Sequence, residues 1–273
     1  MTCVDDDLCG TELGPYSLGG SLGRGGMSTV YRAVDNRTRQ LKACKVMSSR
    51  ASADPGLQAR FAGRACVVDH PNVVPIHEIG EADGRLFVGM ALIEGVDLQT
   101  ALRSGPLHPQ RALLIFAQLC SALAALHQRG FLHMDVKPAN LLLSAAHPTD
   151  HIFLLDYGLI NAGQQLPAES FVGTPNYASP EHLRGQSIGP FSDVYSLTCV
   201  LFALLAGRPP FAGRLTEVIA GHLRGRAPSL ATVSGLPSRI DRVIAAGLSA
   251  DPRRRPADPE ALSAAAAHAL AGC

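Results

Sequence analysis

The spacing of apolar residues changes along the chain, from the two-residue period of strands to the helical period of about 3.6 residues. Residues 16–33 hold two strand-like apolar segments around a Gly-dense turn, and residues 73–98 hold two further strands and a connector. In residues 41–47 the alternation places Ala43 and Lys45 on one face of a strand. These patterns predict a small sheet in the first third of the chain.

Residues 109–129 have apolar side chains at helical spacing. Pro109 stands at the start of this segment and Gly130 just past its end, which is typical of helix termini. We therefore expect a core helix in which His127 and Cys120 are packing residues without chemistry. The apolar positions are Leu113, Phe116, Leu119, Cys120, Leu123 and Leu126.

The longest apolar run covers residues 194–206. Ser192 and Asp193 precede it and are expected to cap a helix that ends at Gly207. At about 13 residues the run is too short for the roughly 30 Å core of a bilayer. We expect a buried helix and no membrane span.

Composition favours a folded globular protein, since 47% of the 273 residues are hydrophobic and 17% are charged. Twenty-four Lys and Arg against 23 Asp and Glu give a net charge of +1, so the charge gives no reason to expect a nucleic acid as partner. The seven Cys form no C-x-x-C pair, which indicates reduced thiols and a cytoplasmic location. Asp5, Asp6 and Asp7 have the wrong charge for a secretory leader.

Candidate chemistry concentrates in one stretch, where Asp135, Lys137 and Asn140 are followed by Asp156 in the pattern Asp-x-Lys-x-x-Asn and then Asp-x-Gly. A lone Asp here would be a surface turn, but this ordered set suits phosphoryl transfer assisted by a metal ion. One carboxylate can accept the proton of a hydroxyl, the Lys can neutralise the migrating group, and the Asn and second carboxylate are hard oxygen ligands for Mg²⁺.

This set resembles the catalytic and metal-binding loops of protein kinases, in the bacterial eukaryotic-like (Hanks-type) Ser/Thr branch. The resemblance implies that Asp135 accepts the proton, Lys137 stabilises the transferring charge, and Asn140 and Asp156 hold Mg²⁺. Lys137 followed by Pro138 favours Ser or Thr over Tyr as acceptor. Transfer would use Mg-ATP.

The Gly-dense turn resembles the family's phosphate-binding loop, in which backbone amides approach phosphate oxygens closely. Gly23, Gly25 and Val30 match its pattern, with Ser28 at the third glycine. Lys45 matches the strand lysine that binds the α- and β-phosphates. The predicted nucleotide-binding residues, which include a hinge after residue 89, are Leu22, Gly23, Arg24, Gly25, Gly26, Met27, Ser28, Val30, Ala43, Lys45, Met90, Ala91, Ile93, Leu142 and Asp156.

The segment that closes on Tyr177-Ala-Ser-Pro-Glu181 resembles the activation segment of these kinases. The resemblance implies that Thr174 bonds the catalytic Asp and Lys, that Asp193 holds the backbone of the catalytic loop, and that Arg255 pairs with Glu181.

Three residues depart from the family pattern. Arg64 stands where a Glu partner of Lys45 is expected, and Asp54, the acidic residue nearby, is expected to cap a helix. Met134 replaces the Arg that binds an activation-loop phosphate at a site such as Ser170. Tyr157 replaces the Phe after Asp156, a nearly isosteric change.

The resemblance implies a two-lobed α+β kinase fold, with a small antiparallel N-lobe sheet carrying one helix and a larger, mainly helical C-lobe, and with ATP in the cleft. We expect an N-terminal extension at 1–15, a kinase domain at 16–268 and a tail at 269–273. The N-lobe would cover 16–92 and the C-lobe 93–268.

The expected function is transfer of the γ-phosphoryl group of ATP to a protein Ser or Thr hydroxyl, with self-phosphorylation among the candidate reactions. A pseudokinase that binds nucleotide or acts as a scaffold is the alternative that Arg64 suggests. A small-molecule kinase is disfavoured by the complete activation segment.

Overall fold

The computed structural model describes residues 7–62, 68–147, 149–156, 160–161 and 174–272. The chain divides into two compact units, which are described separately. Unit 1 comprises Met1–Asp69 and Val74–Glu94, and unit 2 comprises His70–Val73 and Gly95–Cys273.

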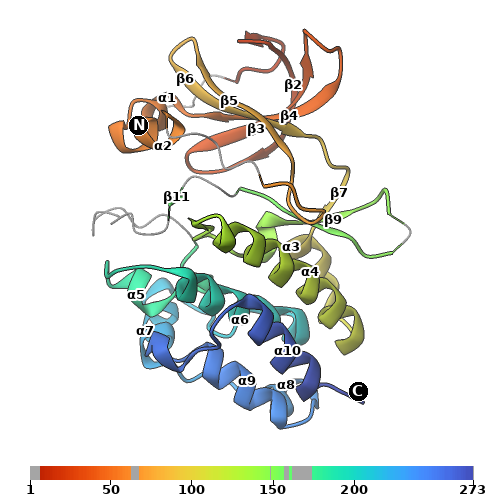
Figure 1. The fold of residues 1–273 in the computed structure, drawn as a ribbon, viewed down its shortest axis with the longest axis vertical. Coiled ribbons are helices and arrows are strands. Elements are labelled where there is room, and N and C mark those ends of the chain that lie inside the picture. The colour runs from red at the N-terminus through yellow and green to blue at the C-terminus, as the bar shows by residue number, and fades with distance from the viewer. Residues whose placement is uncertain (1–6, 63–67, 148, 157–159, 162–173, 273) are drawn as a thin grey trace. The chain divides into compact units, whose positions relative to one another are not determined.

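Unit 1 is built on a six-stranded antiparallel sheet with the strand order β1-β2-β3-β4-β6-β5 (Figure 1). The sheet predicted in the first third of the chain is therefore confirmed. Its strands are Glu12–Leu13 (β1), Tyr16–Arg24 (β2), Ser28–Asp35 (β3), Leu41–Met47 (β4), Ile76–Ala82 (β5) and Arg85–Ala91 (β6).

One face of this sheet buries an apolar cluster around Tyr16, which is fully buried. Its hydroxyl donates to the Glu78 carboxylate at 3.3 Å, and its ring passes directly over Gly89. A Cβ at position 89 would lie 2.1 Å from that hydroxyl, so only glycine fits. The cluster consists of Leu13, Tyr16, Leu18, Tyr31, Ala33, Cys44, Val46 and Phe87.

Two short helices, α1 (Ser49–Ser52) and α2 (Pro55–Ala62), occur where one helix was expected. The break falls before Pro55 because a proline disfavours helical backbone in the residue that precedes it. Asp54 does cap α2, since its carboxylate accepts the Leu57 amide at 2.7 Å.

Unit 2 is mainly helical, as predicted (Figure 1). Its helices are Leu98–Ala101 (α3), Pro109–Gln128 (α4), Pro180–Leu183 (α5), Pro190–Ala206 (α6), Leu215–Arg224 (α7), Leu230–Ser234 (α8), Arg239–Gly247 (α9) and Pro259–Ala269 (α10). Two small antiparallel sheets accompany them, one with the order β10-β9-β7 and one that pairs β11 with β8. Their strands are Gly95–Asp97 (β7), Phe131–Leu132 (β8), Leu141–Ser144 (β9), Ile152–Leu154 (β10) and Ile160–Asn161 (β11).

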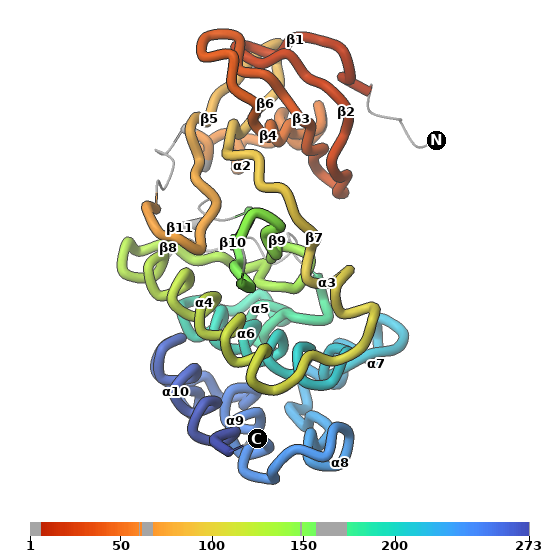
Figure 2. Tube along the Cα trace, turned by 90° about the vertical axis from the view of Figure 1, so that its right-hand side faces the viewer, coloured from red at the N-terminus to blue at the C-terminus, as the bar shows by residue number. Residues whose placement is uncertain are grey.

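The core of unit 2 lies where α4 packs against α6 and α10, which run side by side with it in Figures 1 and 2. Among the described helices α4 alone is long and apolar enough to cross a membrane. Half of its most apolar window is buried inside the protein, as expected for a core helix.

Helix α6 begins earlier than the sequence suggested. The helix starts at Pro190 with Gly189 as its N-cap, so the prediction is right for Ser192, whose Oγ accepts the Gly189 amide at 3.3 Å, and wrong for Asp193. Proline is favoured at this first position because its missing N–H would have no helical partner there. Both residues lie in the first turn, from which Ser192 also reaches Glu181 and Asp193 reaches the backbone of residues 133 and 134.

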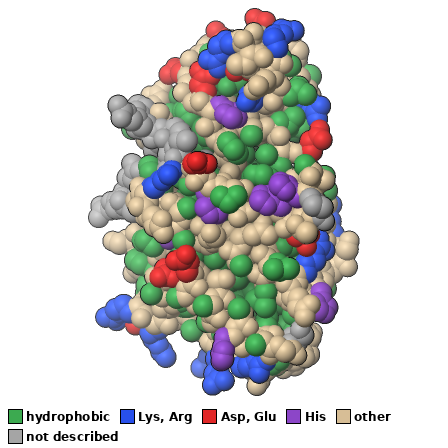
Figure 3. Space-filling model, turned by 45° about the vertical axis from the view of Figure 1, so that its right-hand side comes forward, with side chains coloured by type: hydrophobic (Ala, Val, Ile, Leu, Met, Phe, Trp, Pro, Cys, Tyr) green, Lys and Arg blue, Asp and Glu red, His purple; other side chains and the backbone are tan. Residues whose placement is uncertain are grey.

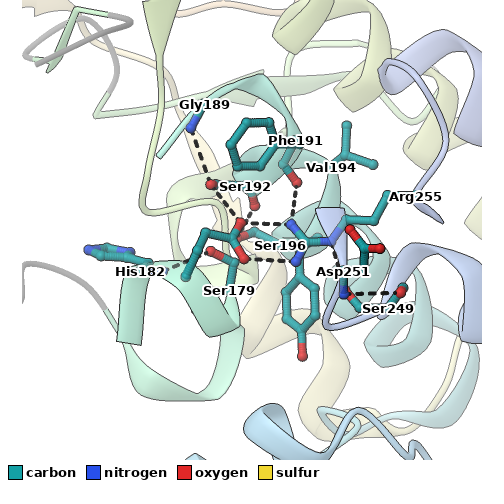
Figure 4. Close-up of polar contacts among 12 residues, drawn as sticks. Ser179, His182, Gly189, Phe191, Ser192, Val194, Ser196, Ser249, Asp251 and Arg255 are labelled. Atoms are coloured by element: carbon teal, nitrogen blue, oxygen red, sulfur yellow. Dashed lines mark hydrogen bonds and ion pairs between the residues drawn. The ribbon is translucent and has the colours of Figure 1, made fainter. Parts of the chain in front are cut away.

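Arg255 and Glu181 form a buried, bidentate ion pair (Figure 4). The guanidinium nitrogens Nη1 and Nη2 each lie 2.7 Å from a Glu181 oxygen, and Ser192 donates to the same carboxylate at 2.7 Å. Nη1 also donates to the Phe191 carbonyl, and Nε to that of Ser249. Burial opposes the charge of Glu181, but the adjacent Arg255 holds its pKa below the ordinary value.

We expect Arg255→Ala to lower the free energy of unfolding by about 3–5 kcal/mol, because a buried carboxylate loses its cation. Urea unfolding measures this loss. Arg253 is the matched control, since its side chain is 90% exposed and pairs with Asp251 at the surface. Arg253→Ala should change the stability by about 0.5 kcal/mol or less, and equal losses in both variants would contradict this interpretation.

His222 on α7 is fully buried beside Phe211 and Tyr195. Its Nδ1 lies 2.8 Å from the Tyr195 hydroxyl. Burial lowers the pKa of His222 to about 4, so the folded state holds the neutral ring.

A depressed histidine pKa makes folding pH-dependent. The unfolded chain takes up a proton near its ordinary pKa of about 6.5, whereas the folded chain does so only near 4. Stability from this group is thus complete above about pH 6.5 and decreases toward pH 4, by on the order of 3 kcal/mol. Urea unfolding of wild type and His222→Gln at both pH values should show a smaller pH-dependent loss in the variant, and parallel losses would refute the assignment.

Candidate functional site

The loop after β8 brings Asp135, Lys137 and Thr174 into direct contact. Lys137 Nζ lies 2.6 Å from Asp135 Oδ2 and 2.8 Å from Thr174 Oγ1, and the Thr174 amide donates to Asp135 Oδ1 at 3.3 Å. The side chains of Lys137 and Asp135 are 20% and 28% exposed, so the pair is sheltered yet reachable. The structure therefore gathers a carboxylate, an ammonium and a hydroxyl from segments 37 residues apart.

Asn140 closes the other side of this loop. Its Nδ2 donates to the Asp135 carbonyl at 2.8 Å and to Asp135 Oδ2 at 3.0 Å. The Leu155 amide in turn donates to the Asn140 carbonyl at 2.9 Å, which ties the residue before Asp156 to the loop. Asp156 has a left-handed backbone, with φ of 61°.

The oxygen atoms of this group fit a magnesium ion. In the described residues the Asn140 side chain bonds Asp135 only through its nitrogen, which leaves the amide oxygen as a ligand atom. An amide oxygen and the Asp156 carboxylate are the hard donors that Mg²⁺ prefers.

The fully buried carboxylate of Asp193 holds the backbone of this loop. Asp193 accepts the backbone amides of His133 and Met134, each at 2.9 Å, and lies 2.8 Å from His127 Nε2. Burial opposes its charge, yet the hydrogen bond and charge of His127 keep the pKa of Asp193 below the ordinary value. The contact with the loop backbone is the one that the resemblance implied.

His127 and His133 were missed as site residues. His127 was read as packing, but it bonds Asp193, and His133 bonds the Leu155 carbonyl at 2.8 Å through Nε2. The sequence did offer one signal for His127: it follows Leu126 in the core helix, and a buried polar side chain needs a hydrogen-bond partner.

Met134 occupies the position before Asp135 with a left-handed backbone, φ of 65°. Its side chain is buried and packs with Leu132 and Ile188. Apolar packing therefore holds this residue, and it has no donor with which to bind a phosphate.

In unit 1 the predicted nucleotide-binding residues share one region of the sheet. Lys45 on β4 pairs with Val30 on β3 and Val88 on β6, while Ala43 pairs with Met90. Cross-strand partners project to the same face, so these side chains form adjacent rows. Ala43 and Lys45 thus share a face, as the alternation predicted.

The Gly-dense segment forms the turn between β2 and β3. The Gly25 amide donates to the Ser28 carbonyl at 2.8 Å, and Gly23 pairs with Val30. Leu22 and Met27 are large apolar side chains that stay about half exposed at this turn.

The predicted hinge begins at the end of β6, where Met90 and Ala91 are the last two residues. The Ala91 amide donates to the Pro75 carbonyl at 2.9 Å. Ile93 lies between β6 and β7. Leu142 lies in β9 of unit 2, paired with Phe153 and Asp97.

Some residues discussed from the sequence lie outside the described part of the chain, namely Asp5, Asp6, Arg64, Tyr157, Gly158 and Ser170. The interpretation of Arg64 as a replacement for Glu therefore stays a prediction.

Surface charges are mixed. On the face drawn in Figure 3, acidic, basic and histidine side chains are interspersed among apolar ones.

Comparisons with known proteins agree with the geometry. A family model described as "Protein kinase domain" matches residues 16–267. Serine/threonine-protein kinase PknE of Mycobacterium tuberculosis is 42% identical over 273 residues, which cover 96% of this chain and 47% of that protein. PknH of the same organism is 38% identical, over 99% of this chain and 44% of its own. The chain thus spans less than half the length of these relatives.

Solved structures show the same fold. The crystal structure of the M. tuberculosis PknI kinase domain matches with a TM-score of 0.79 and 28% identity, over 97% of this chain and 98% of that one. A structure of Rad53 residues 1–466 in complex with AMP-PNP matches with a TM-score of 0.76 at 24% identity, over 91% of this chain and 64% of that one, a likeness of fold alone.

The contacts of Thr174 predict its importance for transfer. Thr174→Ala removes the hydroxyl that bonds Lys137, and a hydrogen bond to a charged group is worth about 1.5–3 kcal/mol, or roughly 10- to 150-fold in kcat. Thr174→Ser keeps the hydroxyl and should stay within a few-fold of wild type. Phosphoryl transfer is assayed after phosphatase treatment of all three proteins, and an active Thr174→Ala enzyme would refute the role.

Proposed function

We propose, from the premise that this chain belongs to the protein kinase family, that it transfers the γ-phosphoryl group of ATP to a Ser or Thr hydroxyl of a protein. The observation that carries the proposal is the contact of Lys137 Nζ with both Asp135 and Thr174. This contact joins a carboxylate, a cation and a hydroxyl group in one hydrogen-bonded cluster, which supports the proposed roles. The proposal places the kinase domain at residues 16–268, with the lobe boundary at 92/93.

In the reaction the acceptor hydroxyl gives its proton to Asp135 as its oxygen bonds to the γ-phosphorus. The bond from that phosphorus to the β-phosphate oxygen breaks, and ADP leaves with its electron pair. Lys137, held 2.6 Å from Asp135, supplies positive charge beside the migrating group. Asn140 holds Asp135 in place through two donated hydrogen bonds.

Asn140 and Asp156 would hold Mg²⁺, which neutralises phosphate charge when bound. In unit 1, Lys45 would orient the α- and β-phosphates, and the backbone of residues 22–28 would approach phosphate oxygens. The Ala91 carbonyl and the Ile93 backbone would bind the adenine edge.

The pseudokinase alternative is less well supported. It rests on Arg64, which lies outside the described residues, whereas Asp135, Lys137 and Asn140 form a complete bonded set. Protein substrates, including this chain itself, follow from the family. A reducing, cytoplasmic setting fits the four free thiols of the described residues, Cys9, Cys44, Cys120 and Cys199.

Incubation with Mg-ATP and a generic protein substrate, followed by intact-mass measurement, tests the function. Wild type should add about 80 Da per phosphate to the substrate or to itself, and Asp135→Asn should add none, because an amide cannot accept the proton. Asp135→Asn is isosteric, so thermal unfolding should show an intact fold. If wild type binds Mg-ATP in a thermal shift assay but transfers nothing, the pseudokinase function replaces this one.

A further inference from the structure

Residues 7–13, called here the N-terminal segment, are built into the sheet of unit 1. Strand β1 pairs with β2 through Glu12 opposite Ser17 and Leu13 opposite Tyr16. The Gly10 amide donates to the Leu18 carbonyl, and the Leu18 amide donates to the Thr11 carbonyl, both at 2.8 Å.

Apolar contacts fix the same segment to the core of unit 1. Leu13 is 3% exposed within the Tyr16 cluster, and Leu8 packs against that cluster. The Leu8 amide donates to the Tyr31 hydroxyl at 3.2 Å, so the segment also reaches β3. Packing and backbone hydrogen bonds therefore hold the N-terminal segment in place without the help of an ion pair.

Asp7 extends this anchored segment to the phosphate-binding turn. Its carboxylate lies 3.3 Å from Arg24 Nη2, and both side chains are about half exposed. The other carboxylate oxygen accepts the Cys9 amide at 3.2 Å, which orients the group.

The β2 arm of the turn pairs with β3 through its backbone, but its side chains are not buried. Residues 20–24 are all exposed, and the pairing of β2 with β3 shifts register on both sides of Ser21. Glycines at 19, 20 and 23 add backbone freedom. The ion pair thus acts on an arm whose side chains gain no support from burial.

We propose that Asp7 is a positioning residue that braces the Gly-dense turn through Arg24 and so raises the affinity for the phosphates of ATP. The proposal rests on the function proposed above, in which this turn binds nucleotide. Its rival is a field effect, in which the Asp7 charge repels phosphate. The two make opposite predictions, because loss of a brace weakens nucleotide binding and loss of a repelling carboxylate strengthens it.

A double-mutant cycle separates them. Titration calorimetry at low ionic strength measures the Mg-ATP dissociation constant of wild type, Asp7→Asn, Arg24→Gln and the double variant. Each single variant should bind about two- to fivefold more weakly, the range open to an exposed ion pair, and the double variant no more weakly than Arg24→Gln alone. Salt at 0.5 M should remove the Asp7 effect by screening.

Arg253→Gln is the matched control, because it breaks an exposed ion pair in unit 2 and should leave nucleotide affinity unchanged. Tighter binding by Asp7→Asn, or additive losses in the double variant, would overturn the brace.

Hydrogen exchange of the nucleotide-free protein provides a readout that does not depend on ATP. Amides of residues 19–26 should exchange faster in Asp7→Asn than in wild type, and the reversed pair Asp7→Arg with Arg24→Asp should restore slow exchange. Unchanged exchange in Asp7→Asn refutes the brace. If wild type fails to bind Mg-ATP, the proposed function fails while the exchange result still decides the brace.

Discussion

The catalytic loop depends on one buried carboxylate. Asp193 has no exposed surface, and its carboxylate accepts hydrogen bonds from two consecutive backbone amides of the loop and contacts His127. A charge removed from water must be compensated in this way, and the compensation fixes the donors in space. Met134, the second of these amide donors, has a left-handed backbone, and the next residue, Asp135, contacts Lys137 and Thr174.

A second buried ion pair supports the segment that supplies Thr174. Glu181 and Arg255 lie 74 residues apart in sequence and bond through both guanidinium nitrogens. Helix α5 starts at Pro180, one residue before Glu181, so the ion pair fixes the point at which the segment from Thr174 enters this helix. Unit 2 thus uses buried charges for position, while Asp135 and Lys137, which we propose carry the chemistry, stay partly exposed.

Unit 1 follows a different physical design. Its apolar cluster around Tyr16 is buried, whereas the Gly-dense turn that we propose binds phosphate is exposed along residues 20–24. Glycine lets the backbone approach a phosphate closely, but its greater conformational freedom makes the turn harder to order. A weak, screened ion pair from Asp7 can therefore matter at this turn more than it would on a packed strand.

The sequence by itself determined the types of element and the ordered chemistry, because periodicity and fixed offsets such as Asp135 to Asn140 are local properties of the chain. Local signals erred at helix ends, as at Asp193, where a proline earlier in the chain starts the helix. The resemblance implied that Arg255 pairs with Glu181, but only the tertiary structure showed that His127 meets Asp193. His127 and Asp193 are 66 residues apart, and no local pattern records that the two side chains share one desolvated site.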